Sequence, residues 1–191
     1  MMKQFLESSQ YIDWKTPEVQ QKAVDLAGEN QEQTEIVKIC FEFVRDEILH
    51  SWDYRMNPVT LRASEVLIHR TGYCYAKSHL LAALLRANGI PAALCYQRLR
   101  LGDDPYYFSL HGLNAVYLNE YGWVRVDARG NKDGVNADFD PPGETLAFDL
   151  EHRGEYDVEG RFAKPLDPVV ETLTTHKDVE TVMQNLPDLE S

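Results

Sequence analysis

The segment from Tyr75 to Ala87, YAKSHLLAALLRA, constrains the fold of this chain more than any other stretch. Most of its positions are leucine or alanine, and a helix that is apolar around most of its circumference has to be covered on most sides. Asn88-Gly89 supplies a left-handed cap after the helix, and Pro91 prevents the helix from continuing. We therefore expect a central helix over residues 75–87, with the rest of the domain packed around it.

Cys74 directly precedes this helix, in the sequence Gly72-Tyr73-Cys74. The first N–H groups of a helix have no partner within the helix and carry a partial positive charge, which favours a thiolate over a thiol. The same N–H groups point toward the oxyanion that forms when a thiolate attacks a carbonyl. Cys74 is therefore our candidate nucleophile. The alternative is a structural cysteine that happens to lie at a helix boundary.

The size and composition of the chain predict a single domain over residues 1–191. The net charge of −12 argues against a nucleic-acid partner, because phosphate binding needs a basic surface. The first residues contain no apolar signal segment, and no run of about 18 apolar residues is present to cross a membrane. We therefore expect a cytoplasmic protein that binds neither nucleic acid nor membrane. The sequence leaves its oligomeric state open.

The chain contains three cysteines, an odd number without the spacing of a zinc site, so we expect neither disulfides nor a bound metal. Cys40 belongs to an apolar stripe at roughly helical spacing that runs from Ile36 to Ile48. Cys95 lies in the middle of a strand predicted over residues 92–99. We predict that Cys40 and Cys95 are packed and inert, since burial in apolar surroundings disfavours the thiolate.

The remaining elements are predicted from capping residues, apolar spacing and turn signals. Helices are expected over residues 17–27 and 63–69, two more short helices begin at Asp167 and Asp178, and a hairpin spans residues 111–118 and 123–128. The segment GNKDGVNADFDPPGE, residues 130–144, is rich in proline, glycine and aspartate. We interpret it as a surface loop, with a loop over the active-site groove as the alternative.

A cysteine nucleophile needs a base, and histidine suits that role near neutral pH. His111 opens the first hairpin strand, and Asp127 stands near the end of the second, where its carboxylate could orient the imidazole. His79 is a poor partner, because it lies about 140° around the helix from Cys74. The remaining histidines are expected at helix ends or in the polar C-terminal region, namely His50, His69, His152 and His176.

The register of the hairpin decides whether His111 and Asp127 meet. A four-residue loop over residues 119–122 would place their side chains on opposite faces of the sheet. A three-residue loop, with Tyr117 opposite Tyr121, would bring the two side chains face to face, with Cβ atoms about 5 Å apart. A Cys-His-Asp site therefore requires a loop with an odd number of residues, or a bulge.

Three segments in this order, TGYCYAKSHLLAALLRANGIPA, HGLNAVYL and GWVRVDARGN, together resemble the bacterial transglutaminase-like superfamily. The resemblance covers roughly residues 35–131, which we expect to form the catalytic core, with residues 132–191 as a C-terminal extension. It implies an α+β fold similar to that of papain-type cysteine proteases, with the central helix packed on an antiparallel sheet. It also implies that Cys74 is the nucleophile, His111 the general base and acid, and Asp127 the orienting acid.

The chain departs from the family pattern in two places. Gly112 follows His111 where family members often have an aromatic residue, so the sequence singles out no substrate-binding residue. Animal transglutaminases hold the oxyanion with a tryptophan upstream of the cysteine. Trp52 lies upstream here, but its spacing does not carry that role over, and we interpret Trp52 and Tyr54 as core or strand aromatics. The additional domains of the animal enzymes are not seen in this sequence, so we expect no calcium dependence and no cofactor.

The candidate residues predict a cysteine-dependent enzyme that forms a thioester with a peptide, protein or small amide substrate. Transfer of the acyl group to water would make it a peptidase or amidase, and transfer to an amine would make it a transglutaminase. Two other interpretations stay open. One is a binding module of the same fold that has lost turnover. The other is a metal site formed by Cys74, His111 and Asp127, which no paired metal-ligand spacing supports.

Overall fold

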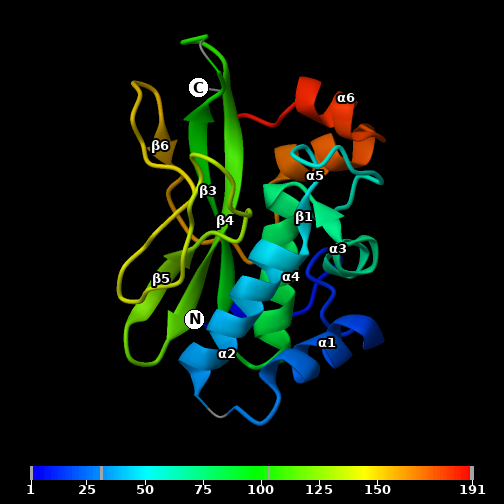
Figure 1. Ribbon diagram of the computed structural model, residues 1–191, viewed down its shortest axis with the longest axis vertical. Coiled ribbons are helices and arrows are strands. Elements are labelled where there is room, and N and C mark those ends of the chain that lie inside the picture. The colour runs from blue at the N-terminus through cyan, green and yellow to red at the C-terminus, as the bar shows by residue number, and fades with distance from the viewer. Residues whose placement is uncertain (1, 31, 103, 190–191) are drawn as a thin grey trace.

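The central helix α4 (Cys74–Ala87) lies between a sheet and a group of shorter helices (Figure 1). The computed structural model describes residues 2–30, 32–102 and 104–189. All the side chains of α4 from Cys74 to Arg86 are buried, which confirms the prediction of a covered central helix. The helix begins one residue earlier than predicted, so Cys74 is its first residue.

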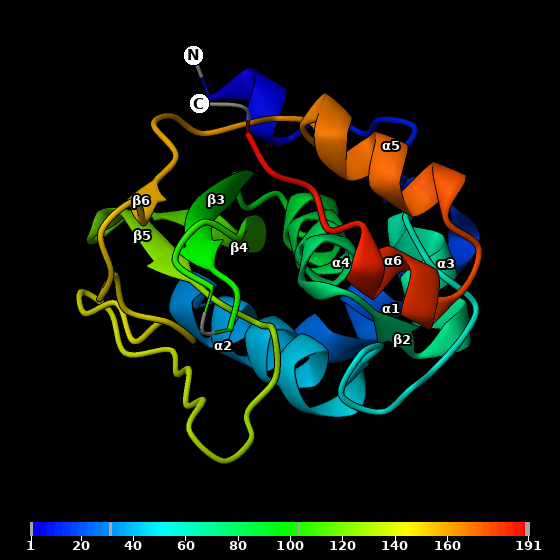
Figure 2. The same cartoon turned by 90° about the horizontal axis from the view of Figure 1, so that it is seen from above.

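Shorter helices cover much of the surface of α4 that the sheet leaves free (Figure 2). They are α1 (Pro17–Ala27), α2 (Gln33–Glu42), α3 (Ala63–His69), α5 (Asp167–Thr175) and α6 (Val179–Gln184), with a 3-10 turn η1 (Lys3–Phe5) and a π-helical turn η2 (Phe43–Glu47). The helices predicted over residues 17–27 and 63–69, and those predicted to begin near Asp167 and Asp178, are confirmed. Among the described residues, no helix has the length and apolar character needed to span a membrane.

The apolar stripe from Ile36 to Ile48 does not form one helix. α2 ends at Glu42, η2 widens the next turn, and Ile48 has an extended backbone. The chain then enters the short strand β1 (Leu49–His50), which pairs in parallel with β2 (Thr71–Gly72) just before α4. His50 therefore does not lie at a helix end, as the sequence suggested, but beside the start of the central helix.

An antiparallel sheet packs against α4, with the strand order β5-β4-β3-β6. The strands are β3 (Ala92–Arg100), β4 (Phe108–Leu118), β5 (Gly122–Val126) and β6 (Tyr156–Asp157). Leu94 and Val116 belong to the core cluster that contains the leucines of α4, whereas Cys95 and Leu113 pack in a second cluster with Phe5. The α+β architecture, with the central helix on an antiparallel sheet, is confirmed.

The C-terminal part of the chain packs back onto this sheet. β6 pairs with β3 along one edge. Farther along, the backbone N–H of Leu110 donates to the carbonyl of Pro187 at 2.7 Å, and Arg98 donates two hydrogen bonds of 2.7 Å to the carboxylate of Asp188. Pro187 thus holds the part of β4 next to His111, and Asp188 holds the adjacent strand β3.

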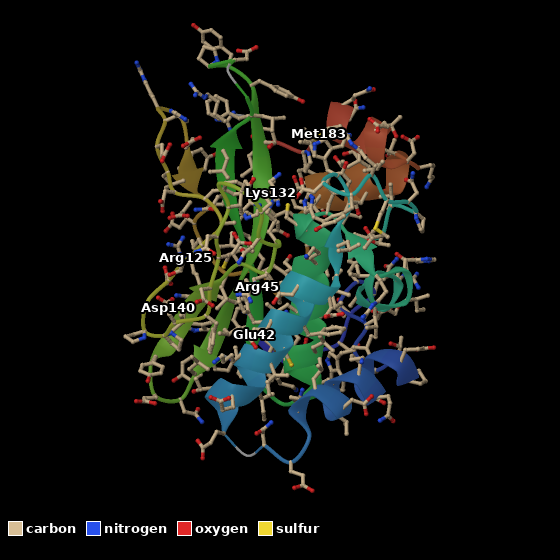
Figure 3. The ribbon with its side chains drawn as sticks, in the orientation of Figure 1. Glu42, Arg45, Arg125, Lys132, Asp140 and Met183 are labelled. Carbon is tan, nitrogen blue, oxygen red and sulfur yellow. The ribbon has the colours of Figure 1, made fainter. Side chains whose placement is uncertain are left out.

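Ion pairs and hydrogen bonds fasten the long loop that follows β5. Arg125 of β5 pairs with Glu144 at 2.8 Å and with Asp157 of β6 at 2.7 Å. Arg45 of η2 donates to the carbonyl of Ala137 at 3.2 Å. Arg125 and Arg45, both labelled in Figure 3, therefore attach the loop at two points, one on the sheet and one on the helical side.

Candidate active site

The Cys74 side chain lies where strand β4 meets the first turn of α4. Tyr73 precedes it with an extended backbone, and the helix begins immediately afterwards. The backbone N–H of Gly112, on β4, donates a long hydrogen bond of 3.5 Å to Cys74 Sγ. The sulfur is therefore held between the helix start and the strand, and Cys74 is only 7% exposed.

The strand and the helix approach this closely because residue 112 has no side chain. A Cβ atom at Gly112 would lie 3.0 Å from both Cα and Cδ1 of Tyr75, closer than such atoms normally approach. The Tyr75 hydroxyl also donates to the carbonyl of Leu110, which joins helix and strand at a second point. Glycine at position 112, where family members often have an aromatic residue, thus lets a backbone N–H reach the sulfur. Sequence reasoning missed this role.

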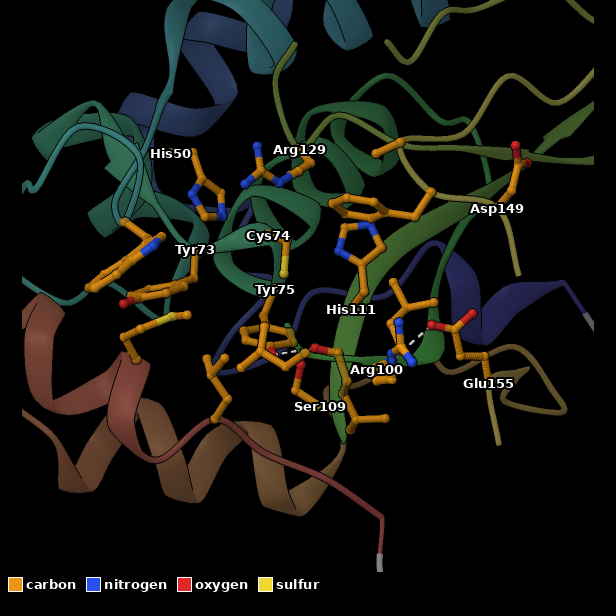
Figure 4. A pocket seen from close by; sticks show the side chains of 18 of the residues that line it. His50, Tyr73, Cys74, Tyr75, Arg100, Ser109, His111, Arg129, Asp149 and Glu155 are labelled. Carbon is orange, nitrogen blue, oxygen red and sulfur yellow. Dashed lines mark hydrogen bonds between the residues drawn. The ribbon is translucent and has the colours of Figure 1, made fainter. Parts of the chain in front are cut away.

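His111 and Asp127 form a buried pair beside Cys74. The Nε2 atom of His111 lies 2.7 Å from Oδ2 of Asp127, which leaves Nδ1 for the sulfur. Figure 4 shows the imidazole next to the Cys74 side chain. The Asp127 carboxylate also accepts the backbone N–H groups of Ala147 and Arg129, each at 3.1 Å. The structure therefore brings together the three residues predicted from the sequence.

The charges of this pair stabilise each other despite burial. Burial alone would lower the pKa of His111, but the Asp127 carboxylate and the neighbouring Cys74 outweigh it and raise the pKa to about 10. Burial alone would raise the pKa of Asp127, whereas His111 and the two backbone N–H groups hold it below its ordinary value. An imidazolium between a carboxylate and a sulfur is therefore favoured near neutral pH.

The hairpin closes with a three-residue loop between Leu118 and Gly122, which pair with each other. The odd loop that the site requires is therefore present. The particular pairing predicted for Tyr117 is wrong, because Tyr117 pairs with Trp123 while Tyr121 lies in the loop.

Asp127 lies just beyond the end of β5 and contacts His111 on β4 from there. β5 ends at Val126, and β4 begins at Phe108, so His111 lies inside its strand rather than at its start. Continuing the observed pairing by one residue places Asp127 opposite Leu113. Asp127 therefore contacts His111 as a diagonal neighbour on the same face, a distance that long side chains can span.

The other two cysteines are buried and free, as predicted. Burial raises the pKa of Cys40 to about 12 and the pKa of Cys95 to about 11. Both thiols therefore stay protonated near neutral pH. Cys74 differs from them by its position at a helix start and by its charged neighbours.

Cys74 and His111 open into a cleft of about 550 Å³ (Figure 4). The loop after β5 borders this cleft, because both Lys132 and Gly134 line it, so the simple surface-loop interpretation is wrong. Met183 of α6 also lines the cleft, and Figure 3 labels it together with Lys132. The wall carries charged or titratable side chains of both signs: Arg100, Arg129, Asp149, Glu151, His152 and Glu155.

The two aromatic residues upstream of the cysteine have different environments. Trp52 lines the cleft, is partly buried, and carries the Arg55 guanidinium 3.3 Å above its ring centroid. Tyr54 is 59% exposed. The interpretation of both as core or strand aromatics is therefore wrong for Tyr54 and incomplete for Trp52, which packs against the core but also forms part of the cleft wall.

Two further histidines are buried near this region. His79 contacts the carbonyl of Leu61 through Nδ1 at 2.7 Å and does not join the cleft, in agreement with its predicted position around the helix. His50 lines the cleft, and its ring contacts that of Tyr73 edge-on, with centroids 5.6 Å apart. Sequence reasoning missed His50, because the short strand β1 that carries it has no periodic signal.

The three candidate side chains form a row rather than a cluster. Asp127 contacts Nε2 of His111, and Cys74 lies on the other side of the imidazole. In the described parts of the chain, no group of three histidine, cysteine or acidic side chains is placed to hold a metal ion. A row of this kind suits proton exchange between neighbours.

The helix-borne cysteine, the antiparallel sheet and the histidine–aspartate pair define an α+β domain of the cysteine-protease kind. The sequence model of the transglutaminase-like superfamily matches residues 20–128, which is more than half of the chain. The chain therefore belongs to the transglutaminase-like superfamily.

Two solved structures illustrate the fold. A candidate cysteine protease from Cytophaga hutchinsonii is 23% identical, with a TM-score of 0.51, over 65% of this chain and 40% of that chain. The periplasmic domain of TgpA from Pseudomonas aeruginosa is 21% identical, with a TM-score of 0.50, over 65% of this chain and 45% of that chain. The matched region is thus less than half of either structure, and these likenesses concern the fold. No curated protein sequence matches this chain.

Proposed function

We propose that this protein is a cysteine-dependent enzyme that transfers an acyl group from an amide or ester to water or to an amine. The row of Cys74, His111 and Asp127 at the start of α4 carries this proposal. A purely structural cysteine would not need a charged histidine–aspartate pair buried beside it. Burying such a pair is unfavourable unless both partners are held by hydrogen bonds.

In the proposed reaction, the Cys74 thiolate attacks the substrate carbonyl carbon, and a C–S bond forms. Backbone N–H groups at the start of α4 stabilise the oxyanion of the tetrahedral intermediate. The imidazolium of His111 gives its proton to the leaving amine or alcohol as the bond to that group breaks, which leaves a thioester and a neutral imidazole. Asp127 keeps the imidazole oriented throughout.

The second half of the reaction releases the acyl group. A water molecule or an amine attacks the thioester carbon, and neutral His111 takes the proton that the nucleophile loses. The C–S bond then breaks, and the thiolate and imidazolium are restored. Transfer to water gives peptidase or amidase activity, and transfer to an amine gives transglutaminase activity.

The proposed substrate is a peptide, a protein side chain or a small amide, since the 550 Å³ cleft is open enough for a short segment of chain. We further propose a cytoplasmic location, which the three unpaired cysteines support. Cell fractionation with an antibody would test the location.

Mass spectrometry tests the reaction directly. The protein is incubated with a peptide pool and an active ester, quenched in acid and digested, and Cys74 is searched for an acyl adduct. We expect an adduct on Cys74 in the wild type and none in Cys74→Ser. Absence of any adduct, while iodoacetamide still labels Cys74, would favour a binding module that has lost turnover.

A further inference from the structure

His50 is a buried imidazole in the cleft wall that the proposed reaction does not use. Its ring is 7% exposed, and its Nδ1 atom is buried without a hydrogen-bond partner among the described residues. A buried polar atom without a partner is unfavourable by about 1–3 kcal/mol. The surroundings of Nδ1 therefore decide which ring nitrogen carries the proton, while the ring itself lines the cleft.

The carboxylate of Asp53 identifies the favoured tautomer of His50. Its Oδ2 atom lies 3.6 Å from Nδ1 of His50, just beyond hydrogen-bond distance. Asp53 is itself held by Arg129 at 2.7 Å and by Lys132 at 2.8 Å, and these contacts outweigh burial and lower its pKa to about 2. A negative charge on this side of the ring favours the proton on Nδ1, so Nε2 carries the lone pair.

The surroundings keep the His50 ring neutral. Burial is the largest effect, and the positive charges of Arg129, Lys77 and His111 act in the same direction, while Asp53 opposes them. The pKa of His50 is therefore well below its ordinary value. A neutral imidazole with its lone pair on Nε2 can accept a hydrogen bond at neutral pH.

His50, Cys74 and His111 line the same cleft. In the view of Figure 4, the rings of His50 and His111 lie on different sides of the Cys74 side chain. A nucleophile that attacks a thioester on Cys74 would thus meet His111 on one side and His50 on the other. Water and primary amines each carry at least two hydrogens, one for each imidazole.

We propose that His50, oriented by Asp53, binds the incoming nucleophile by accepting one of its hydrogens through Nε2, while His111 removes the other. The proposal rests on the proposed acyl-transfer function and adds a binding site for the acyl acceptor, which is water or a primary amine. One N–H or O–H bond of the incoming water or amine breaks, and its proton passes to His111. The hydrogen that is bonded to His50 stays on the water or amine. His50 is thus needed for release of the acyl group and not for its capture.

Two substitutions at His50 separate this role from a structural one. In His50→Gln the side-chain amide oxygen can reach the position of Nε2 and still accept a hydrogen bond. In His50→Asn the amide can replace only Nδ1, so the contact toward Asp53 is kept and the acceptor in the cleft is lost. A binding role therefore predicts that Gln retains more activity than Asn, and a structural role predicts the reverse.

Stopped-flow kinetics with p-nitrophenyl acetate, with and without glycinamide, measure the two halves of the reaction. The burst of p-nitrophenol reports thioester formation, and the steady rate reports release. We expect His50→Asn to keep the burst rate and to slow release by about 10- to 100-fold, the usual effect of misplacing a reactant. His50→Gln should recover part of this loss, and His69→Gln, on an exposed part of α3, should behave as the wild type.

The outcomes distinguish this inference from the proposed function. If His50→Asn slows the burst and the release equally, or slows neither of them, His50 does not bind the acyl acceptor. The same conclusion follows if His50→Asn retains more activity than His50→Gln. Thermal unfolding of each variant excludes loss of the fold as the cause. A wild type that gives no burst and no acyl adduct, although iodoacetamide labels Cys74, would contradict the proposed function and this inference with it.

Discussion

Gly112 and Tyr75 are so close that a single added methyl group on Gly112 would lie 3.0 Å from the Tyr75 Cα atom. The substitution Gly112→Ala should therefore push β4 away from the start of α4 and remove the N–H that donates to the Cys74 sulfur. We expect a loss of stability of roughly 1–3 kcal/mol and slower alkylation of Cys74 by iodoacetamide.

Val116→Ala on the same strand is the matched control. Val116 is fully buried in the core, so its truncation should lower stability by roughly 1–3 kcal/mol without moving the helix start. Equal alkylation rates for Gly112→Ala and Val116→Ala would show that the close approach at Gly112 has no effect on the sulfur.

Asp127→Asn should reduce the rate of acyl-adduct formation on Cys74 by on the order of 100-fold or more, because the imidazole loses its orienting charge. The protein should still fold but lose roughly 1–3 kcal/mol of stability. Both oxygens of Asp127 accept backbone N–H groups, so the asparagine NH₂ has to face one donor, from Ala147 or from Arg129. Circular dichroism and urea unfolding would measure the fold and the stability. Asp25→Asn, on the exposed face of α1, is the control. Full activity in Asp127→Asn would remove Asp127 from the mechanism.

The three cysteines should differ in their reaction with iodoacetamide. Burial raises the pKa of Cys40 to about 12 and of Cys95 to about 11, so both should stay unlabelled in the native protein. We expect Cys74 to be labelled first, because it lies at a helix start in the cleft wall. His111→Ala should change the pH dependence of its labelling rate, because the imidazole next to the sulfur is lost. Peptide mapping after labelling between about pH 5 and 9 tests this. Equally slow labelling of all three, or an unchanged profile in His111→Ala, would indicate a structural pair.

The raised pKa of His111 predicts a pH-dependent contribution to stability. Its pKa is about 10 in the folded protein and about 6.5 in an unfolded chain, so the folded state holds the proton more tightly. The stabilisation is fully present below about pH 6.5 and is lost as the pH rises toward 10. The difference in free energy of unfolding between wild type and His111→Gln, measured with urea, should shrink across this range. A constant difference would mean that His111 is not charged in the folded protein.

The helix start at Cys74 and the hairpin that carries His111 and Asp127 depend on local signals, which explains why the sequence predicts these elements. That the three residues act together was implied by the resemblance to the transglutaminase-like superfamily. The cap after the central helix and the turn between two apolar strands each involve residues close in the chain. The exact hairpin register was missed, although Gly122 offered a clue. Gly122 has a φ of 76°, and a three-residue hairpin loop is commonly followed by a residue in this left-handed conformation, which glycine adopts without strain.

The position of His50 could not be predicted, because a distant residue determines it. The apolar spacing from Ile36 to Ile48 is that of one continuous helix, but the chain turns out of it at η2. The buried amine of Lys77, on α4, donates to the carbonyls of Arg45 and Ile48 and holds this turn. Such a contact between an amine and backbone carbonyls 29 or more positions away leaves no pattern in the sequence.

The contact between Ala147 and Asp127 was missed for a similar reason. The donor is a backbone N–H, which every residue except proline possesses, so the identity of residue 147 carries no signal. The same holds for the carbonyl of Pro187 that accepts from Leu110. Sequence patterns report side chains well, and they report backbone donors and acceptors of loops poorly.

The hydrogen bond between Leu110 and Pro187 has a consequence for the order in which the protein is made. The ribosome synthesises the strand that carries His111 long before it adds Pro187, which holds the neighbouring part of that strand, and Asp188, which holds Arg98 on the adjacent strand β3. The nascent chain therefore carries Cys74 and His111 for a period in which the contacts from residues 187 and 188 do not yet exist. During that period the strand next to His111 lacks a hydrogen-bond acceptor for the backbone N–H of Leu110.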